Sequence, residues 1–427
     1  MKLLILTPYV PYPINSGGNQ GFFRLIDILR KYIDVSIILS VNPSDSDNVK
    51  ALQTLWNDVK FHIYRKGEYK PEVTNPSYYN FLKNLRASVD RKLKRQQASA
   101  DDIVRRHSTI TTSDFYMPFE EGYVNFVHDV IDAGSYDLIQ VDFFEYINLV
   151  NALPADIKTV FIHHELRYVR EECESNLFRK HTPMDLFLYN YTKSFEIQCL
   201  NQYDAVVTVT DVDKEKLQKE LNPGIIIESS PAIIDAKQVD FSGEFKFNDR
   251  LVFLGGSDHF PNLDAIDWFL NNCWNELLEQ NPMLELNVIG QWKSRISKGY
   301  KEHFKNVHFK GFVENLQNEL QNSIMITPIR IGSGVRMKIL EAMNYGSPLV
   351  TTSVGCEGIG LDNDKDCFIA DDSKSFIDAI LKLSRNNILC NEFRRSAKQK
   401  FDVRPDSAQL AEIRLNIYKK ILSDSIK

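Results

Sequence analysis

The stretch IMITPIRIGSGVRMKILEAMNYGSPLVTTSVGCEG, residues 324–358, contains the signals that decide the fold. Its apolar beginning, 324–328, predicts a buried strand, and a Gly-Ser-Gly turn follows at 332–334. We expect a helix at about 335–345, because apolar residues recur there at the spacing of one helical face before a glycine and a proline end it. Residues 349–352 predict a second strand. The stretch is therefore a strand–helix–strand unit, which is typical of an α/β protein.

The junction between the first strand and the helix combines groups that suit a bound anion. Gly332 and Gly334 let the backbone approach a ligand closely, and the free N–H groups of the first helical turn favour negative charge. Arg336 and Lys338 add two cations there, where they oppose the helix dipole unless an anion such as a diphosphate is bound. Glu341 lies on the same helical face as Lys338, and its carboxylate can accept hydrogen bonds from the two hydroxyls of a ribose. A solvated Lys–Glu pair beside a tight turn is the simpler interpretation, but the combination favours a nucleotide.

The sequence GSGVRMKILEAMNYGSPLVTT resembles the donor-nucleotide segment of retaining glycosyltransferases of family 4, the glycosyl transferases group 1. The resemblance implies an α/β protein with two Rossmann-like domains facing across a cleft, the GT-B fold. It makes Glu341 a ligand of the nucleotide ribose and places Ser333 and Gly334 in the donor site. The family usually has two glutamates in this segment, and the first would fall at Ser333, which is not an acid. This departure leaves open how the sugar ring of the donor is held.

Length and composition limit the classes of protein to which the chain can belong. The chain has 427 residues, which suggests two or three domains with full hydrophobic cores. Its formal net charge of -6 argues against nucleic acid as a partner. Six scattered cysteines without a C-x-x-C pair fit reduced thiols in a cytosolic protein, and no apolar run approaches the roughly 18 residues that a membrane helix needs. We therefore expect a soluble, cytoplasmic protein.

The N-terminal half opens with a glycine-rich connection between two elements. Residues 2–7 predict a strand, about 22–31 a helix and 35–40 a second strand, with Gly17 and Gly18 in the loop before the helix. No G-x-G-x-x-G sequence follows the first strand, so the dinucleotide-binding pattern is missing. In the resemblance, the two glycines match the loop that faces the donor phosphates from the N-terminal domain.

A basic stretch at about 77–106 contrasts with the acidic chain around it. The simpler interpretation is a solvated face of a helix. The other is a surface on the acceptor side that contacts anionic lipid, because each clustered base near such a membrane contributes about 1 kcal/mol. On the second interpretation the protein would be peripheral at the inner membrane face.

Polar residues follow two predicted strands, at 136–141 and 159–163. Asp142 ends the first, and His163 and His164 end the second. Ligands of open α/β sheets gather at the carboxyl ends of strands, so these three are the candidate catalytic residues. Successive side chains of a strand point to opposite faces, so only one of the two histidines should reach the cleft. Many members of the resembled family have a histidine–acid pair here.

The predicted strand at 251–254 starts a second series of strands and helices. Gly256 follows it in a segment that aligns with the first loop of the family's donor domain. Many members use an arginine and a lysine on the diphosphate there, whereas this chain has a histidine, a proline and Asn262. The two bases Arg336 and Lys338 are therefore expected to do that work.

Three segments are predicted. Residues 1–230 would form an acceptor-side Rossmann-like domain with the basic insertion, residues 231–400 the donor-nucleotide domain, and residues 401–427 a helix that crosses back to the first domain.

The function that these features favour is transfer of a sugar, of the hexosyl type, from a nucleotide diphosphate-sugar to a hydroxyl of a glycan or glycolipid acceptor. The resemblance implies retention of configuration and a role in cell-surface polysaccharide synthesis. No cofactor beyond the donor is expected, and no metal, because the DVD sequence at 211–213 is expected to cap a helix. A sugar-nucleotide epimerase on the same scaffold and a non-catalytic nucleotide-binding protein are the alternatives.

Overall fold

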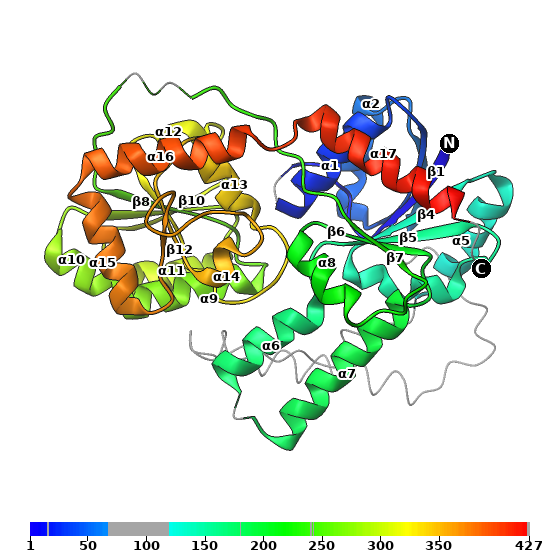
Figure 1. The fold of residues 1–427 in the computed structure, drawn as a ribbon, viewed down its shortest axis with the longest axis horizontal. Helices are drawn as coiled ribbons and strands as arrows, with labels where there is room; N and C mark the ends of the chain where they lie inside the picture. Colours follow the sequence, from blue (N-terminus) through cyan, green and yellow to red (C-terminus); the bar gives the residue numbers. More distant parts are fainter. Residues whose placement is uncertain (15–16, 67–118, 180, 240, 242, 425–427) are drawn as a thin grey trace.

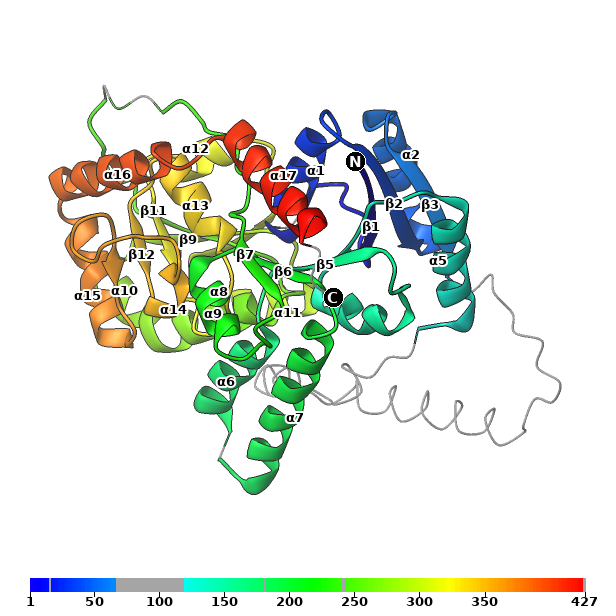
Figure 2. The ribbon, with the colours of Figure 1, turned by 45° about the vertical axis from the view of Figure 1, so that its right-hand side comes forward.

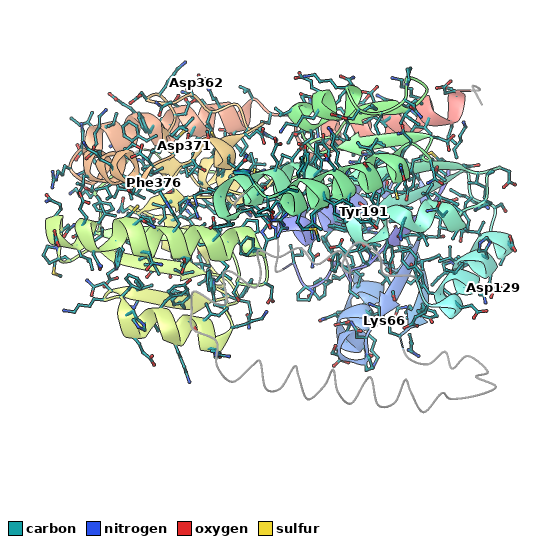
Figure 3. The ribbon with its side chains drawn as sticks, turned by 90° about the horizontal axis from the view of Figure 1, so that it is seen from below. Lys66, Asp129, Tyr191, Asp362, Asp371 and Phe376 are labelled. Carbon is teal, nitrogen blue, oxygen red and sulfur yellow. The ribbon has the colours of Figure 1, made fainter. Side chains whose placement is uncertain are left out.

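The computed structural model describes residues 1–14, 17–66, 119–179, 181–239, 241 and 243–424. These residues form two α/β halves that lie side by side, each built around its own sheet (Figure 1). Seen from below, Lys66 and Asp129 belong to one half, and Asp371 and Phe376 to the other (Figure 3). The basic stretch expected at 77–106 lies outside the described residues.

The first sheet has seven parallel strands in the order β3-β2-β1-β4-β5-β6-β7. In the register, Leu3 of β1 lies opposite Val35 of β2 and Leu138 of β4. The strands are near-continuous apolar runs because both faces of the sheet are covered. They are β1 (Lys2–Thr7), β2 (Asp34–Val41), β3 (Lys60–Arg65), β4 (Leu138–Asp142), β5 (Lys158–His163), β6 (Ala205–Thr208) and β7 (Ile226–Ser229).

Helices cover both faces of this sheet. Leu3 and Ile5 of β1 pack toward α1 and α2, whereas the alternate residues Leu4 and Leu6 pack toward α5, α7 and α8. The helix α6 and its partner α7 form a hairpin that projects away from both sheets (Figures 1 and 2). The helical segments are α1 (Gly17–Leu29), η1 (Pro43–Asp45), α2 (Ser46–Leu55), α5 (Glu121–Ala133), η3 (Phe144–Ala152), α6 (Arg167–Phe178), α7 (Pro183–Leu200) and α8 (Asp211–Gln218).

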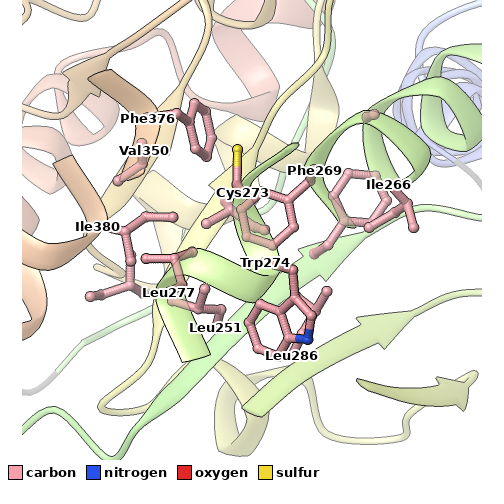
Figure 4. Packing of buried hydrophobic residues seen from close by; sticks show 14 of the residues in the cluster. Leu251, Ile266, Phe269, Cys273, Trp274, Leu277, Leu286, Val350, Phe376 and Ile380 are labelled. Carbon is pink, nitrogen blue, oxygen red and sulfur yellow. The ribbon is translucent and has the colours of Figure 1, made fainter. Parts of the chain in front are cut away.

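The second sheet has six parallel strands in the order β10-β9-β8-β11-β12-β13. Trp274 and Phe376 pack with the strand residue Leu286 in its core (Figure 4). The strands are β8 (Arg250–Leu254), β9 (Glu285–Ile289), β10 (Val307–Gly311), β11 (Ile324–Thr327), β12 (Leu349–Thr351) and β13 (Phe368–Ile369). The helical segments are α9 (Phe260–Phe269), η4 (Leu270–Trp274), α10 (Asn275–Gln280), α11 (Ser294–His303), α12 (Leu316–Leu320), α13 (Met337–Asn344), α14 (Ser353–Cys356) and α15 (Ser373–Ser384).

Two helix boundaries near the expected site differ from the prediction. Helix α1 begins at Gly17 rather than near residue 22, so the glycines lie in its first turns instead of a preceding loop. Gly21 faces Ala232 closely enough that an added Cβ would lie 3.5 Å from the Ala232 Cβ. Helix α13 begins at Met337, because Arg336 has non-helical dihedral angles after the Gly-Ser-Gly turn.

The last two helices connect the halves. Helix α16 (Asn387–Asp402) packs against α13 of the second half, and α17 (Ser407–Ser423) packs against α1 of the first (Figure 2). Ala411, Ile417 and Tyr418 of α17 join the hydrophobic cluster that contains Leu3 and Ile5. The end of the chain therefore lies on the first half. None of the helices in the described part of the chain combines the length and apolar character that crossing a membrane requires.

Candidate functional site

The loop between β11 and α13 meets the loop between β5 and α6 at the boundary of the two halves. The backbone N–H of Leu166 donates to Ser333 Oγ at 2.6 Å, and the N–H of Gly334 donates to Asp213 Oδ2 at 3.0 Å. A Cβ at Gly334 would lie 2.2 Å from the carbonyl oxygen of His164, and the residue has a φ of +74°. Only glycine fits this approach, so the turn brings the start of α13 against the end of β5.

Lys338 lies in the first turn of α13 and has no acidic partner among the residues that the structure describes. Its Nζ donates to Asn262 Oδ1 at 2.5 Å and lies 4.4 Å from the centroid of the Phe253 ring. Burial, with a smaller contribution from Arg336, lowers the pKa of Lys338 to about 7. Within the described ranges Lys338 forms no ion pair, so its positive charge is uncompensated.

Arg336 lies just before α13 and is only 8 % exposed. Its Nη1 donates to the carbonyl oxygen of Gly334, and its Nη2 has no hydrogen-bond partner among the residues that the structure places. Burial lowers the pKa of Arg336, although the field of Glu165 and, more weakly, of Glu357 opposes the effect. A buried cation with an unused donor, Arg336, and a half-buried one, Lys338, therefore lie at the start of one helix.

The loop after β8 holds Lys338 in place. Asn262 of α9 donates its Nδ2 to the carbonyl oxygen of Gly256 at 3.0 Å while its Oδ1 accepts from Lys338. A Cβ at Gly256 would lie 2.8 Å from the backbone oxygen of Gln291, so this position also requires glycine. Asn262, which stands where a cation was expected from the resemblance, thus connects Lys338 to the predicted donor residue Gly256.

Glu341 lies where α13 meets α1 of the other half. Its Oε1 accepts from Gln20 Nε2 at 2.6 Å. Gln20 follows Gly17 and Gly18 in the first turns of α1, so the structure brings the two predicted glycines and Glu341 to the same boundary. Arg24, one turn further along α1, pairs with Asp235 at 3.4 Å.

Asp142 and His164 form a pair at the ends of β4 and β5. His164 Nε2 lies 3.0 Å from Asp142 Oδ1, and Phe143 stacks on the imidazole with ring centroids 4.2 Å apart. Asp142 is buried, whereas the side chain of His164 is 24 % exposed. Phe143 has a φ of 69°, a strained conformation for a bulky residue, and such strain concentrates at functional sites.

His163 has a different environment from His164. Its Nε2 lies 2.6 Å from Glu196 Oε1, and both side chains are buried. The carboxylate of Glu196 also accepts from the backbone N–H groups of Arg167 and Tyr168 at 2.9 and 2.8 Å. His163 and Glu196 therefore hold the start of α6, and of the two histidines only His164 is accessible, as the alternation along a strand predicts.

Two acids at the boundary were not among the predicted site residues. Burial alone would raise the pKa of Glu165. Arg170 and His259 nevertheless hold that pKa well below its usual range. Its Oε2 lies 3.4 Å from Arg170 and 4.0 Å from His259 of the second half. Asp213 was expected only within a helix cap, and Thr210, not Asp211, caps α8. No sequence signal marks the bond between Asp213 and Gly334, because the residues are 121 positions apart.

Within the described portion of the chain, no group of three or more His, Cys, Asp or Glu side chains is placed to hold a metal ion.

The fold defines the class: it is the GT-B fold of glycosyltransferases with two Rossmann-like domains. Residues 248–386, which include Arg336 and Lys338, match the family model described as Glycosyl transferases group 1. Among known sequences, the chain is 23% identical over 405 residues to an uncharacterized 44.6 kDa protein in the cps region of Klebsiella pneumoniae. That match covers 90% of this chain and 91% of the relative.

Solved structures share the fold at low sequence identity. S. aureus TarM superimposes with a TM-score of 0.66, 12% identity and 98% coverage of both chains. Sucrose-phosphate synthase from Thermosynechococcus elongatus gives a TM-score of 0.66 at 12% identity and 100% coverage of both chains. Anabaena Alr3699/HepE in complex with UDP-glucose gives 0.63 at 12% identity, covering 98% of this chain and 100% of that one.

Proposed function

We propose that this protein is a glycosyltransferase that moves a sugar from a nucleoside diphosphate-sugar to an acceptor hydroxyl. The observation that carries the proposal is the pair of the buried Arg336 and the half-buried Lys338, which lies at the start of α13 without an ion pair among the described residues. Removing a cation from water without an ion-pair contact is costly, so a site that retains two such cations is suited to an anionic ligand. The N–H groups of the first helical turn add to the attraction for phosphate.

The diphosphate is also the group on which negative charge develops when the bond to the sugar breaks. Arg336 and Lys338 are fixed by Gly334 and Asn262 before any ligand arrives. Donors that are already oriented stabilise developing charge without the cost of reorganisation. We propose that these cations neutralise the leaving diphosphate in place of a divalent metal, so transfer should persist in excess EDTA.

The nucleoside would lie along α13 toward α1. Glu341 is one helical turn beyond Lys338, and its carboxylate faces the first half through Gln20. A carboxylate can accept hydrogen bonds from both hydroxyls of a ribose while it keeps a contact with Gln20. UDP is the first nucleotide to test, because structures of the same fold include complexes with UDP and UDP-glucose.

The sugar would lie between the phosphates and His164. The backbone of His164 touches the Gly334 turn, and its imidazole is oriented by Asp142 and Phe143. We propose that His164 contacts the reacting sugar or the incoming hydroxyl and that Asp142 holds the imidazole in position. Because His163 is bonded to Glu196 and buried, it has a supporting role in this scheme.

Assignment to family 4, retention of configuration and hexosyl transfer follow from the resemblance of residues 332–352 and belong to the same proposal. The acceptor would be a glycan or glycolipid of a polysaccharide pathway. The relative from a cps region of Klebsiella pneumoniae supports that role.

The test is titration calorimetry with UDP, UDP-glucose and uridine on the wild type and on Lys338→Met. We expect UDP and UDP-glucose to bind wild type and uridine to bind much more weakly. Lys338→Met should weaken UDP roughly 10- to 100-fold, the worth of one charged hydrogen bond of about 1.5–3 kcal/mol. Without ligand, the variant should melt at a higher temperature, because it removes a half-buried charge that has no ion pair.

The matched control is Lys398→Met on α16. Lys398 is a lysine that is buried, but it pairs with Asp402. Its replacement should lower the melting temperature and leave UDP affinity unchanged. Unaltered UDP affinity in Lys338→Met, or no affinity of the wild type for any nucleoside diphosphate tested, would contradict the proposed function.

A further inference from the structure

A continuous series of hydrogen bonds joins the last helix of the chain to His164. Tyr418 of α17 donates its hydroxyl to Gln140 Oε1 in β4. Gln140 donates its Nε2 to Asp142 Oδ2 at 2.6 Å, and Asp142 Oδ1 lies 3.0 Å from His164 Nε2. Tyr418 and Gln140 are fully buried and Asp142 is 1% exposed, so water does not compete for these bonds.

The direction of each bond follows from what the groups can donate. A carboxylate only accepts hydrogen bonds, so Gln140 must turn its amide NH2 toward Asp142 and its oxygen toward Tyr418. The Tyr418 hydroxyl must then donate to that oxygen. Burial raises the pKa of Tyr418, which keeps the hydroxyl protonated. The guanidinium of Arg414, a donor-only group 6.0 Å from the centroid of the Tyr418 ring, lies on the same helix. Every step therefore has one allowed direction.

These bonds determine which imidazole nitrogen of His164 carries the proton. Gln140 occupies one carboxylate oxygen of Asp142, so the other oxygen is directed at Nε2 of His164. An imidazole that donates from Nε2 has Nδ1 as its acceptor nitrogen. Phe143 stacks on the ring and limits its rotation. The tautomer and the ring plane are thus set by different neighbours.

We propose that Tyr418 and Gln140 are positioning residues that hold His164 in the Nε2–H tautomer, with Nδ1 available to a substrate hydroxyl. The effect on catalysis rests on the proposed function, whereas the tautomer does not. Helix α17 follows α16, which packs against α13, the helix that carries Lys338. The C-terminal segment therefore contacts the elements that carry both parts of the proposed site, which gives the crossing helix a role beyond packing.

The first test is the effect of Tyr418→Phe on the imidazole nitrogens. In protein labelled with ¹⁵N-histidine, the His164 signals are identified by their loss in His164→Gln. We expect the wild type to show a protonated Nε2 and an unprotonated Nδ1. In Tyr418→Phe, Gln140 can rotate and Asp142 loses its fixed donor, so the His164 shifts should move toward the average of the two tautomers. Wild-type shifts in the variant would overturn the proposal.

The matched control is Tyr203→Phe. Tyr203 is also fully buried, and its hydroxyl donates to the carbonyl oxygen of Ile147 at 2.9 Å. Both variants lose one buried hydroxyl and should lose similar stability. Only Tyr418→Phe should change the His164 signals, and equal changes in both would show a merely structural effect.

The second test separates binding from turnover with UDP-glucose as the probe and release of UDP as the readout. Tyr418→Phe should lower kcat roughly 10-fold and change UDP affinity less than twofold, because the cations of α13 are untouched. The double variant Tyr418→Phe with Gln140→Leu removes both partners and leaves no stranded hydroxyl. It should show no further loss, since residues of one network are not additive. A kcat of the double variant well below that of Tyr418→Phe would show that the two residues act independently and would contradict the network.

The outcomes distinguish the two proposals. If the wild type binds none of the nucleoside diphosphates tested, the proposed function fails, while the nitrogen shifts still decide the role of Tyr418. If UDP binding and turnover are normal in Tyr418→Phe, the function stands and the positioning role is refuted.

Discussion

The carboxyl ends of the two sheets present opposite electrostatic situations. At the end of β5, His163 faces Glu196, His164 faces Asp142, and Glu165 faces Arg170. At the start of α13, Arg336 and Lys338 form no ion pair within the described ranges. Paired groups are already held in place, whereas unpaired buried cations are costly until a negative ligand arrives. The first half therefore supplies fixed geometry, and the second supplies the attraction for the donor.

The largest loss of stability is expected when the buried pair of His163 and Glu196 in the first half is broken. Glu196→Ala leaves His163 and the N–H groups of Arg167 and Tyr168 without their acceptor. We expect the free energy of unfolding in urea to fall by about 3–5 kcal/mol, the cost of removing one partner of a buried pair. As a control, Glu220→Ala breaks an exposed pair with Lys193 and should cost less than about 1 kcal/mol. Similar small losses in both variants would contradict the contrast.

The contact between the turn before α13 and the end of β5 can be broken at Gly334. An added Cβ meets the carbonyl oxygen of His164 at 2.2 Å, and the φ of +74° strains any other residue. We expect Gly334→Ala to lose about 2–4 kcal/mol of stability from strain and overpacking together. Gly360→Ala is the control, because its φ is +83° but nothing lies within 4 Å of the added atom. It should lose about 1 kcal/mol, and thermal unfolding of both variants checks the difference.

The next prediction concerns Glu341 and the ribose of the donor. If its carboxylate binds the ribose hydroxyls, the wild type should prefer UDP to 2′,3′-dideoxy-UDP by about 1.5–3 kcal/mol. In Glu341→Ala this preference should disappear, because the affinity for UDP falls while the affinity for 2′,3′-dideoxy-UDP stays the same. Calorimetry with both nucleotides measures it. Equal weakening of the two nucleotides would show that Glu341 supports the fold of the site without contacting the ribose.

The smallest effect, at most about 1.4 kcal/mol per pH unit, concerns proton uptake by Lys338. Its pKa is about 7 in the folded protein without ligand and near 10.4 in an unfolded chain. The unfolded state therefore binds more protons between these values, so Lys338 should make the ligand-free protein more stable as the pH rises from 7 toward 10. A bound diphosphate favours the charged amine, so UDP affinity should instead fall by up to tenfold per pH unit above 7.

Lys338→Met is the control for the pH series, because it should remove both trends. Calorimetry in buffers of different ionisation enthalpy should show protons taken up when wild type binds UDP at pH 8. Proton release on binding, or an affinity that does not change between pH 7 and 9, would contradict the assigned pKa and the placement of the phosphates.

Much of the fold follows from local sequence patterns. Apolar runs at β1, β4 and β11 predict buried parallel strands, since residues on both faces must be apolar. The Gly-Ser-Gly turn predicts the change from β11 to helix, although α13 starts two residues later than expected. The glycines at 17 and 18 were expected in a loop, yet they lie in α1, because packing of α1 against Ala232 and α13 outweighs the weak helix propensity of glycine.

By itself the sequence indicated alternating strands and helices in both halves, and it placed two cations and an acid beside one turn, because periodicity and turn chemistry act over a few residues. Only the tertiary structure decided which groups are paired. That Lys338 meets Asn262, Gly334 meets Asp213, and Tyr418 reaches toward Asp142 through Gln140 depends on residues from 76 to 278 positions apart. Such partners are chosen by the packing of whole elements, and no local pattern encodes them.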